Sequence, residues 1–234
     1  RLGLQQIDLY QMHAWDALTP IEETLRFLDD AIGAGKIAYY GFSNFLGWHV
    51  TKASGLAKAH GWAAPATLQP QYNLLVREVE FEIVPACIDA GMGLLPWSPL
   101  AGGWLAGKYK RDVPPTGATR LGENPNRGME AYAPRNAQER TWAIIDAVGK
   151  IAKARGVGLA QVALAWVAAQ PAVTSVILGA RNPEQLADNL GAASLALSMD
   201  EIATLSTVSA PLIGDYPYGS GGTEQRRRKI QGGR

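Results

Sequence analysis

The sequence of 234 residues predicts an α/β fold of the (β/α)8 TIM-barrel type, in which helices cover a parallel sheet. Strand and helix patterns alternate along the chain, with strands expected near residues 7, 38, 67, 94 and 176. No GxGxxG turn follows the first strand, which disfavours a doubly wound dinucleotide-binding sheet. Polar or aromatic residues follow most of the strands, as is typical of a barrel. Because a barrel of this type has about eight strands, the predicted barrel is incomplete.

A strand is expected over IDLYQMH, at 7–13, because apolar and polar residues alternate there with a period of two. Leu9, Gln11 and His13 share one face of this strand. The pattern places His13 at the carboxyl end of the strand, which is the edge of an α/β sheet where functional residues gather.

The next segment, TPIEETLRFLDDAIGAG, has the pattern of an amphipathic helix. Thr19 is the expected N-cap, with Pro20 at the first helical position and Glu22 as the acid of a capping box. Gly33 or Gly35 is expected to end the helix. The apolar residues on one face of it are Ile21, Leu25, Leu28 and Ile32.

The later elements continue the alternation of strand and helix. The expected strands are at 37–44, 93–100 and 175–178, and a short strand with a loop is expected at 66–73. The expected helices are at 46–60, 78–91, 137–155, 159–169, 182–190 and 199–208. Asn182 is the expected N-cap of its helix with Gln185 as capping-box partner, and Ser198 or Asp200 is expected to cap the last one. The stretch from Gly102 to Arg135 is rich in Gly, Pro, Asn and Arg, and its length predicts a lid, a binding loop or a disordered segment.

The charge composition gives no strong overall field. Lys and Arg number 22 against 21 Asp and Glu, so neither a nucleic acid nor a membrane surface is expected as a partner. The run RRRK at 226–229 is interpreted as a solvated tail, with a nucleic-acid patch as the alternative. Cys87 is the single cysteine and no second His or Cys has metal-ligand spacing, so no metal site is expected. Without a signal peptide or an apolar run of about 18 residues, the expected location is the cytoplasm.

Each residue that follows a strand has two interpretations when it is taken alone. His13 is either a hydrogen-bonded structural residue or a catalyst. Ser43 and Asn44 either cap the next helix or bind a ligand. Trp97 is either a core residue or a stacking platform for a flat ring. Arg181, just before a predicted helix N-terminus, is either a surface residue or a phosphate ligand.

The order of the motifs resolves much of this ambiguity. YQMH, GFSNF, QPQYN, PWSPLAGGWLAGKY and LGARNPEQLADN follow one another in an arrangement that closely resembles the aldo-keto reductase superfamily, and best its bacterial branch with a long loop after the seventh strand. The resemblance covers residues 1–218 and includes SAPLIGDYPY. It implies an NADP(H)-binding barrel that reduces aldehydes and ketones to alcohols by hydride transfer, and of which this chain contains about the last five βα units.

The resemblance also implies roles for individual residues. His13 matches the catalytic histidine that orients the substrate carbonyl, and Trp15 is implied beside it in the substrate pocket. The residues implied to hold the nicotinamide are Ser43, Asn44, Gln69 and the stacking Trp97. Those implied at the pyrophosphate are Ser98, Leu100, Gly102 and Lys108, those at the 2′-phosphate are Gly179, Arg181 and Gln185, and those near the adenine are Asp188 and Asn189. A fixed cation such as Arg181 favours the additional phosphate of NADP over NAD.

Part of the family's catalytic set has no counterpart in this sequence. The resemblance implies a further Asp, a proton-donating Tyr and a Lys on the first three βα units, whereas this chain begins at about the fourth. None of its eight tyrosines stands in the motif of the proton donor, so the chain is expected to be N-terminally truncated and inactive in carbonyl reduction by itself. The alternative is a catalytically silent nucleotide-binding or oligomer-forming subunit.

The resemblance divides the chain into a barrel part at 1–218 and a Gly/Arg-rich tail at 219–234. An incomplete barrel exposes strand edges and apolar faces, so self-association into a homo-oligomer, or instability, is expected. The other expected partner is a small carbonyl substrate.

Overall fold

The strands of the protein form one parallel sheet, seen in a computed structural model that describes residues 2–219, 221 and 222. Within these residues four strands lie side by side in the order in which they occur in the chain. They are β1 (Ile7–Met12), β2 (Ile37–Ser43), β3 (Thr67–Gln69) and β4 (Gly93–Leu94). Their register pairs Tyr10 with Tyr40, and Leu68 with both Phe42 and Leu94. All four carboxyl ends therefore point to the same edge.

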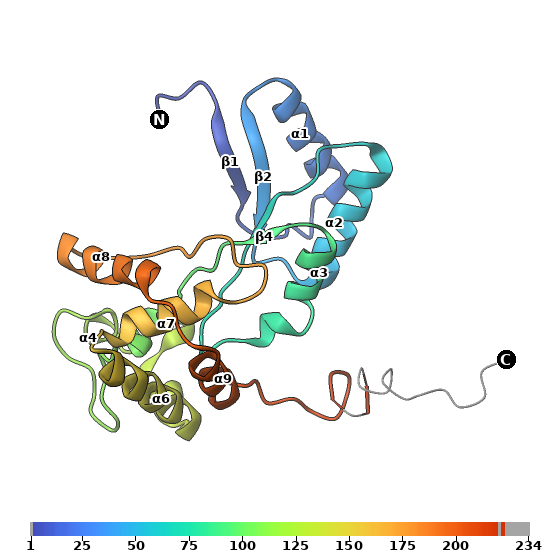
Figure 1. Ribbon diagram of the computed structural model, residues 1–234. Coiled ribbons are helices and arrows are strands. Elements are labelled where there is room, and N and C mark those ends of the chain that lie inside the picture. Colours follow the sequence, from blue (N-terminus) through green and yellow to red (C-terminus); the bar gives the residue numbers. More distant parts are fainter. Residues whose placement is uncertain (1, 220, 223–234) are drawn as a thin grey trace.

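Helices α1 (Ile21–Gly33), α2 (Gly47–His60) and α3 (Ile83–Asp89) lie on one side of the sheet (Figure 1). The predicted apolar face of α1 buries Ile21, Leu25 and Leu28, while Ile32 is only partly buried. These side chains pack into the same cluster as Tyr40, Phe42 and Leu68 from the sheet. The helical period of the sequence thus correctly identified the face that meets the sheet.

The predicted cap of α1 is wrong. Pro20 is the N-cap residue, and the helix start has no hydrogen bond from a side chain. The Thr19 hydroxyl instead donates to Asp16 Oδ2 at 2.7 Å, and the Leu18 N–H donates to Asp16 Oδ1 at 2.8 Å. These two contacts of Asp16 form a turn before the helix and leave Thr19 unavailable for capping.

Prolines shorten two predicted elements. Pro85 has no N–H to bond the carbonyl four residues earlier, so the helix expected at 78–91 is divided into a short 3₁₀ turn, η1 (Glu78–Glu80), and α3. Pro96 likewise cannot donate to a ladder, and β4 covers only two residues of the strand expected at 93–100. Beyond β4 a single parallel bridge joins Gln71 to Trp97.

The fifth predicted strand, at 175–178, is not a strand. The chain runs beside β4 through one parallel bridge between Leu94 and Val173, with hydrogen bonds from Leu94 N to Ala172 O at 2.7 Å and from Ile177 N to Pro96 O at 3.0 Å. The pairing is interrupted because β4 ends so early. Within the described residues the sheet is open beyond β1, so they do not close a barrel.

The segment predicted as a long loop contains short helical turns. These are η2 (Ala101–Ala106), α4 (Arg120–Glu123), η3 (Gly128–Glu130) and α5 (Tyr132–Asn136). They gather around the fully buried Trp104, whose indole N–H donates to the Glu130 carbonyl at 3.0 Å. The Trp104 ring stacks on Tyr132 with centroids 5.5 Å apart and meets Trp142 edge-on at 5.7 Å. An aromatic centre therefore orders a segment without secondary-structure period.

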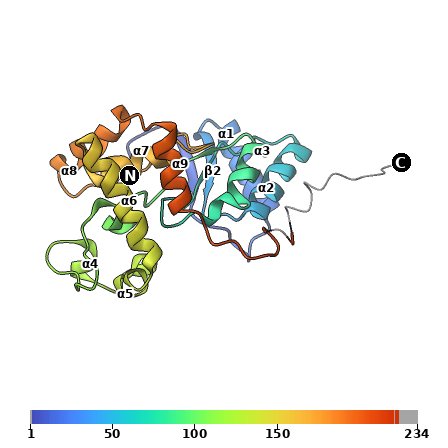
Figure 2. The same ribbon diagram turned by 60° about the horizontal axis from the view of Figure 1, so that its bottom comes forward.

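The remaining helices form a second group on the other side of the molecule (Figures 1 and 2). They are α6 (Glu139–Arg155), α7 (Leu159–Ala168), α8 (Pro183–Leu190), the 3₁₀ turn η4 (Gly191–Ser194) and α9 (Met199–Val208). Asn182 and Ser198 are confirmed as N-caps, since their side-chain oxygens accept the N–H groups of Gln185 and Glu201 at 2.9 and 3.2 Å. Gln185 does not complete its capping box, because its side chain accepts the Arg181 N–H instead.

Over the described residues no single helix is long and apolar enough to cross a membrane, and α6 and α7 reach that length and composition only as a pair bent by 103°. The predicted tail at 219–234 lies outside the described residues except for Gly219, Gly221 and Gly222. The basic run at 226–229 lies wholly outside them.

Candidate functional site

A first pocket, of about 400 Å³, lies where the sheet strands end. Each strand contributes to it through the residues at or just beyond its carboxyl end. Its lining residues are His13, Ser43, Asn44, Gln69, Trp97 and Met129. Parallel pairing explains this gathering, because residues that follow neighbouring strands of one sheet meet at the same edge.

Asn44 connects the walls of the first pocket. Its backbone is left-handed, with a φ of 57°, and its N–H donates to the Gln69 carbonyl at 3.2 Å. The side-chain amide donates to the His13 carbonyl at 3.0 Å and accepts the Trp97 indole N–H at 3.1 Å. Asparagine tolerates this backbone conformation better than most residues. One amide therefore joins the ends of β1 and β2 to the ring of Trp97.

Ser43 lies beneath Asn44 and is buried. Its hydroxyl donates to the Gln69 carbonyl at 2.7 Å, so β2 and β3 are joined by a side chain just where their ladder ends. The hydroxyl oxygen keeps its capacity to accept a hydrogen bond. The first pocket thus combines a flat indole, an exposed imidazole and fixed amide and hydroxyl groups.

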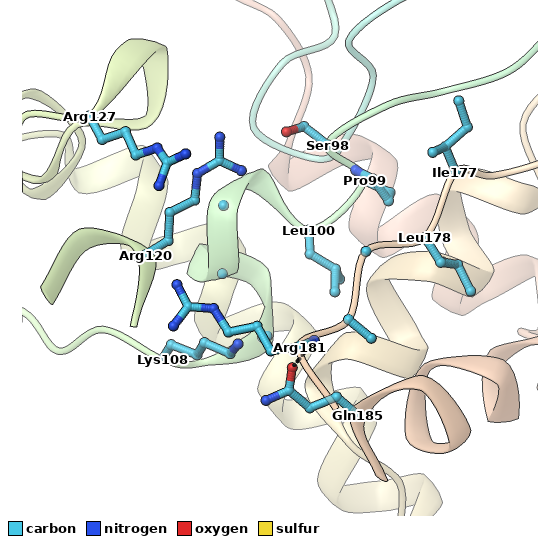
Figure 3. Close-up of a pocket in the computed structure, with 15 residues that line it drawn as sticks. Ser98, Pro99, Leu100, Lys108, Arg120, Arg127, Ile177, Leu178, Arg181 and Gln185 are labelled. Carbon is cyan, nitrogen blue, oxygen red and sulfur yellow. Dashed lines mark hydrogen bonds between the residues drawn. The ribbon is translucent and has the colours of Figure 1, made fainter. Parts of the chain in front are cut away.

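A second pocket, of about 470 Å³, follows directly along the chain from Trp97. It is rich in small residues and cations, and in the described part of the chain no carboxylate lines it. The cations are Lys108, Arg120, Arg127 and Arg181. Figure 3 shows them on one side of the pocket, opposite Ile177 and Leu178. Such a wall attracts an anion.

The turn η2 and the residues just before it line the second pocket in an uncommon backbone conformation. Ser98 and Ala101 have φ values of 53° and 48°, and Gly102 and Gly103 follow at 65° and 110°. Non-glycine residues adopt such angles only when the surroundings hold them there. The Asn73 amide donates to the Ser98 carbonyl at 2.9 Å, and the Tyr109 hydroxyl donates to the Gly102 carbonyl at 2.9 Å. These bonds fix the carbonyls that close the turn.

Arg181 immediately precedes Asn182, which is the N-cap of α8. Its two terminal nitrogens donate to both carboxylate oxygens of Glu123, at 2.8 and 3.1 Å, and Nη1 also donates to the Ala118 carbonyl at 3.0 Å. The side chains of Arg181 and Glu123 are 43% and 52% exposed. The Arg181 N–H meets Gln185 Oε1 at 3.1 Å, the contact drawn dashed in Figure 3.

A third pocket, of about 190 Å³, shares Leu100, Ala106, Lys108, Gly179 and Gln185 with the second. Its other lining residues are Gly158, Leu159, Ala160, Asp188 and Asn189. Asp188 is positioned by Gln161, whose amide donates to the Asp188 carboxylate at 2.8 Å and to its carbonyl at 2.9 Å. The three pockets therefore lead from the strand ends, through the residues that follow Trp97, to α8.

All cofactor-site residues predicted from the sequence line one of these pockets, and His13 lines the first. Trp15 lies elsewhere. It stacks on His49 with ring centroids 4.1 Å apart and meets Phe45 edge-on at 5.4 Å. Burial lowers the pKa of His49, whose Nδ1 accepts the Leu46 N–H at 3.0 Å. The role implied for Trp15 in substrate binding stays a prediction.

Sequence reasoning missed Arg120, Arg127 and Met129, which the long segment brings to the pockets. The available signal was the arginine content of that segment, but it does not say which arginines face inward. In the part of the chain that the structure describes, no group of three or more His, Cys, Asp or Glu residues is placed to hold a metal ion.

Comparison with known proteins gives a consistent result. A family model described as "Aldo/keto reductase family" matches residues 1–210. The chain is 35% identical over 217 residues, 93% of its length, to the "Uncharacterized oxidoreductase YrpG" of Bacillus subtilis. It is 33% identical over 211 residues, 90% of its length, to the versiconal hemiacetal acetate reductase of Aspergillus parasiticus. It is 37% identical over 193 residues, 82% of its length, to a probable voltage-gated potassium channel subunit beta of Arabidopsis thaliana.

The chain spans only part of these relatives. The matched regions make up 63%, 59% and 58% of the three proteins' own lengths.

Proposed function

Because the chain belongs to the aldo/keto reductase family, we propose that it forms the cofactor-binding part of an NADP(H)-dependent reductase of aldehydes and ketones. The observation that carries the proposal is the succession of three pockets. The lining of the first ends at Trp97, that of the second begins at Ser98, and the second and third share lining residues. The first offers a flat ring beside an imidazole, the second offers cations, and the third offers polar groups next to α8. An extended dinucleotide has the same succession of chemistry.

The residues present fit NADP(H). The second pocket has four cations and no lining carboxylate among the described residues, which suits the phosphate groups. Ser98, Leu100, Gly102 and Lys108 are the residues proposed for the pyrophosphate, and Arg120 and Arg127 join them here. Ser43, Asn44 and Gln69 are proposed to bind the carboxamide, and the half-buried Trp97 the nicotinamide ring. Asp188 and Asn189 are proposed near the adenine.

Bound NADPH supplies the hydride for carbonyl reduction. His13 is proposed to donate a hydrogen bond to the carbonyl oxygen of the substrate, because its exposed imidazole lines the same pocket as Trp97. Asn44 holds the backbone of His13 and the indole of Trp97 at the same time, so it fixes the position of one relative to the other. Orienting a carbonyl in this way lowers the entropic part of the barrier.

A second candidate is a catalytically silent nucleotide-binding subunit. Among the described residues that line the first pocket there is no tyrosine and no carboxylate, so the pocket offers His13 alone for proton transfer. The similarity to a probable voltage-gated potassium channel subunit beta also favours a binding role. Reading the coding DNA that precedes Arg1 separates the candidates, because an in-frame Asp, Tyr and Lys set supports the reductase and its absence supports the silent subunit.

Titration with NADPH tests the cofactor site directly. Quenching of tryptophan fluorescence is expected, because Trp97 lines the first pocket. Arg181→Ala is expected to raise the Kd for NADPH roughly tenfold and to leave the Kd for NADH nearly unchanged, since it removes a charged contact with the 2′-phosphate. Arg26→Ala is the matched control, because Arg26 is an exposed arginine of α1 paired with Asp30. Failure of the chain to bind NADPH would contradict both candidates.

Turnover of an aromatic aldehyde by the NADPH-loaded chain is the second measurement. The 234-residue chain is expected to bind the cofactor without oxidising it at a measurable rate. Robust turnover would show that these residues contain a proton donor and would exclude the silent subunit.

A further inference from the structure

The carboxylate of Glu123 binds the guanidinium of Arg181, which the proposed function assigns to the 2′-phosphate of NADP(H). Both of its carboxylate oxygens accept from Arg181, in the parallel two-bond arrangement that a phosphate group would also use. Nη1 has no hydrogen left, because it also donates to the Ala118 carbonyl. Three of the four N–H groups at the two terminal nitrogens of Arg181 are thus donated to the segment that contains α4.

From this contact we propose that Glu123 is an internal competitor of the 2′-phosphate, and that it sets how strongly the site prefers 2′-phosphorylated over unphosphorylated adenosine nucleotides. The inference rests on the proposed function. A phosphate that takes the end of the fork must displace the carboxylate. A phosphate that approaches the Nε side instead comes within a few ångströms of the same negative charge, which opposes it.

The ion pair between Arg181 and Glu123 is weak enough for a phosphate to displace the carboxylate. Arg181 and Glu123 are about half exposed, and such ion pairs are weak, so a doubly charged phosphate can replace the carboxylate. Glu123 also differs from the other charged residues near the second pocket. Those that line it are all cations, while Glu123 is the acid bonded to one of them. Its removal therefore leaves the Arg181 guanidinium without the carboxylate that pairs with it.

Glu123 is the last residue of α4, so its ion pair with Arg181 also helps to hold this helical turn in place. Arg120, which lines the second pocket, begins the same helical turn, and Thr119 caps that turn through the Gly122 N–H at 2.9 Å. If the ion pair served mainly to hold Arg120 at the pocket, removing it would weaken nucleotide binding. A competitor role predicts that removing the Glu123 carboxylate increases the affinity for the nucleotide, whereas a role in holding α4 predicts that the affinity decreases.

The test compares two probes that differ in one phosphate, adenosine 2′,5′-bisphosphate and 5′-AMP, by calorimetric titration of the 234-residue chain. Glu123→Gln is expected to tighten binding of the bisphosphate by about threefold to fivefold, the equivalent of a half-exposed ion pair, and to leave 5′-AMP unchanged. Glu184→Gln is the control, because it removes the same charge from the first turn of α8 next to Arg181. Its effect is expected to be less than about twofold, because exposed charges without direct contact are screened by salt.

The gain is expected to disappear in the background of Arg181→Ala, because the competitor acts through that guanidinium. Equal or weaker binding of the bisphosphate by Glu123→Gln would overturn the inference while leaving the proposed function intact. If the unmodified chain binds neither probe, the proposed function and the inference both fail. A gain of equal size for both probes would also overturn the inference, because it would show a general charge effect.

Discussion

Gly41 shows how a single residue determines the position of the site. It lies in β2 between Gln11 of β1 and Thr67 of β3, whose side chains meet across it in a hydrogen bond of 2.9 Å. A Cβ at this position would lie 2.1 Å from Thr67 Oγ1, 2.3 Å from Gln11 Oε1 and 2.6 Å from the Thr67 carbonyl oxygen. Ser43 ends the same strand two residues later and Asn44 comes directly after it, so their placement depends on this close approach.

Gly41→Ala is therefore expected to break the bond between Gln11 and Thr67 and to destabilise the protein by about 2–3 kcal/mol. Urea denaturation followed by circular dichroism measures the change. Gly55→Ala is the matched control, since this exposed position inside α2 has no atom within 4 Å of an added Cβ and should gain up to about 1 kcal/mol. Equal stability of the Gly41→Ala variant and the unmodified protein would contradict the close packing of the three strands.

At the same scale, the sequence predicted those site residues whose position follows from a strand. His13, Asn44, Gln69 and Trp97 converge because the ends of parallel strands share an edge. Arg120 could not be predicted to line a pocket, because a segment without period has no register to say which side chains turn inward. Glu123 was invisible for the same reason, and only the folded segment brings it to Arg181.

Among the elements, the long amphipathic ones were predicted well and the short ones poorly. Helix α6 is two residues shorter at its start than the expected 137–155, and α7 one residue shorter at its end than the expected 159–169. A period of 3.6 residues sustained over several turns explains this success. The segment at 175–178 has strand composition, but whether it pairs depends on the length of β4, which Pro96 limits. A strand at 175–178 could therefore not be assigned without knowing where β4 ends.

Helix capping provides the prediction at the scale of elements. Ser198 and Glu201 form a complete capping box at the start of α9, and Glu201 also meets the Arg155 guanidinium at 2.8 and 2.6 Å. The hydrogen bond from Arg155 and the backbone N–H of Ser198 lower the pKa of Glu201 from 4.5 to about 2. The same carboxylate therefore joins the end of α6 to the start of α9.

Since this pKa is lowered on folding, the stabilisation is complete above pH 4.5 and is lost as the pH falls from there to about 2. Glu201→Gln is expected to lower Tm at pH 7 by roughly 1–3 °C, and the difference from the unmodified protein should shrink through that acid window. Scanning calorimetry at several pH values measures it. Glu23→Gln, an exposed acid in the first turn of α1, is the control. A difference in Tm that stays constant down to pH 2 would contradict the assigned pKa shift.

The helices of the described residues form two groups, and α9 lies on the side of the second group that faces the first in Figure 2. One group, α1 to α3, packs on the sheet, while the other includes α6 to α9. Arg77, just before η1, joins the two through its contacts with α9. Its Nη1 donates to the Ser206 carbonyl at 2.6 Å and to the Ser209 hydroxyl at 2.8 Å. Its guanidinium also lies 5.0 Å from the ring centroid of Trp166 in α7.

The charge of Arg77 is compensated by Glu80, which accepts from Nε at 2.7 Å and from Nη2 at 2.8 Å. The Tyr72 hydroxyl donates to the same carboxylate at 2.7 Å, and burial raises the pKa of Tyr72. The side chains of Arg77 and Glu80 are only 9% and 26% exposed. Removing Arg77 alone would therefore leave a largely buried carboxylate without its cation, which costs more than the pair contributes.

Arg77→Met is expected to destabilise the protein by about 3 kcal/mol, because it breaks the contacts with α9 and leaves the carboxylate of Glu80 without its cation. The double variant Arg77→Met with Glu80→Gln should lose clearly less stability than the sum of the two single variants, since it contains no unpaired carboxylate at position 80. Urea denaturation measured both by circular dichroism and by tryptophan fluorescence tests whether the protein unfolds in a single step. Because Arg77 joins the two groups of helices, the two signals should coincide in the unmodified protein and separate in Arg77→Met. Coincident transitions in that variant would show that the sheet and the second group of helices are held together by other contacts.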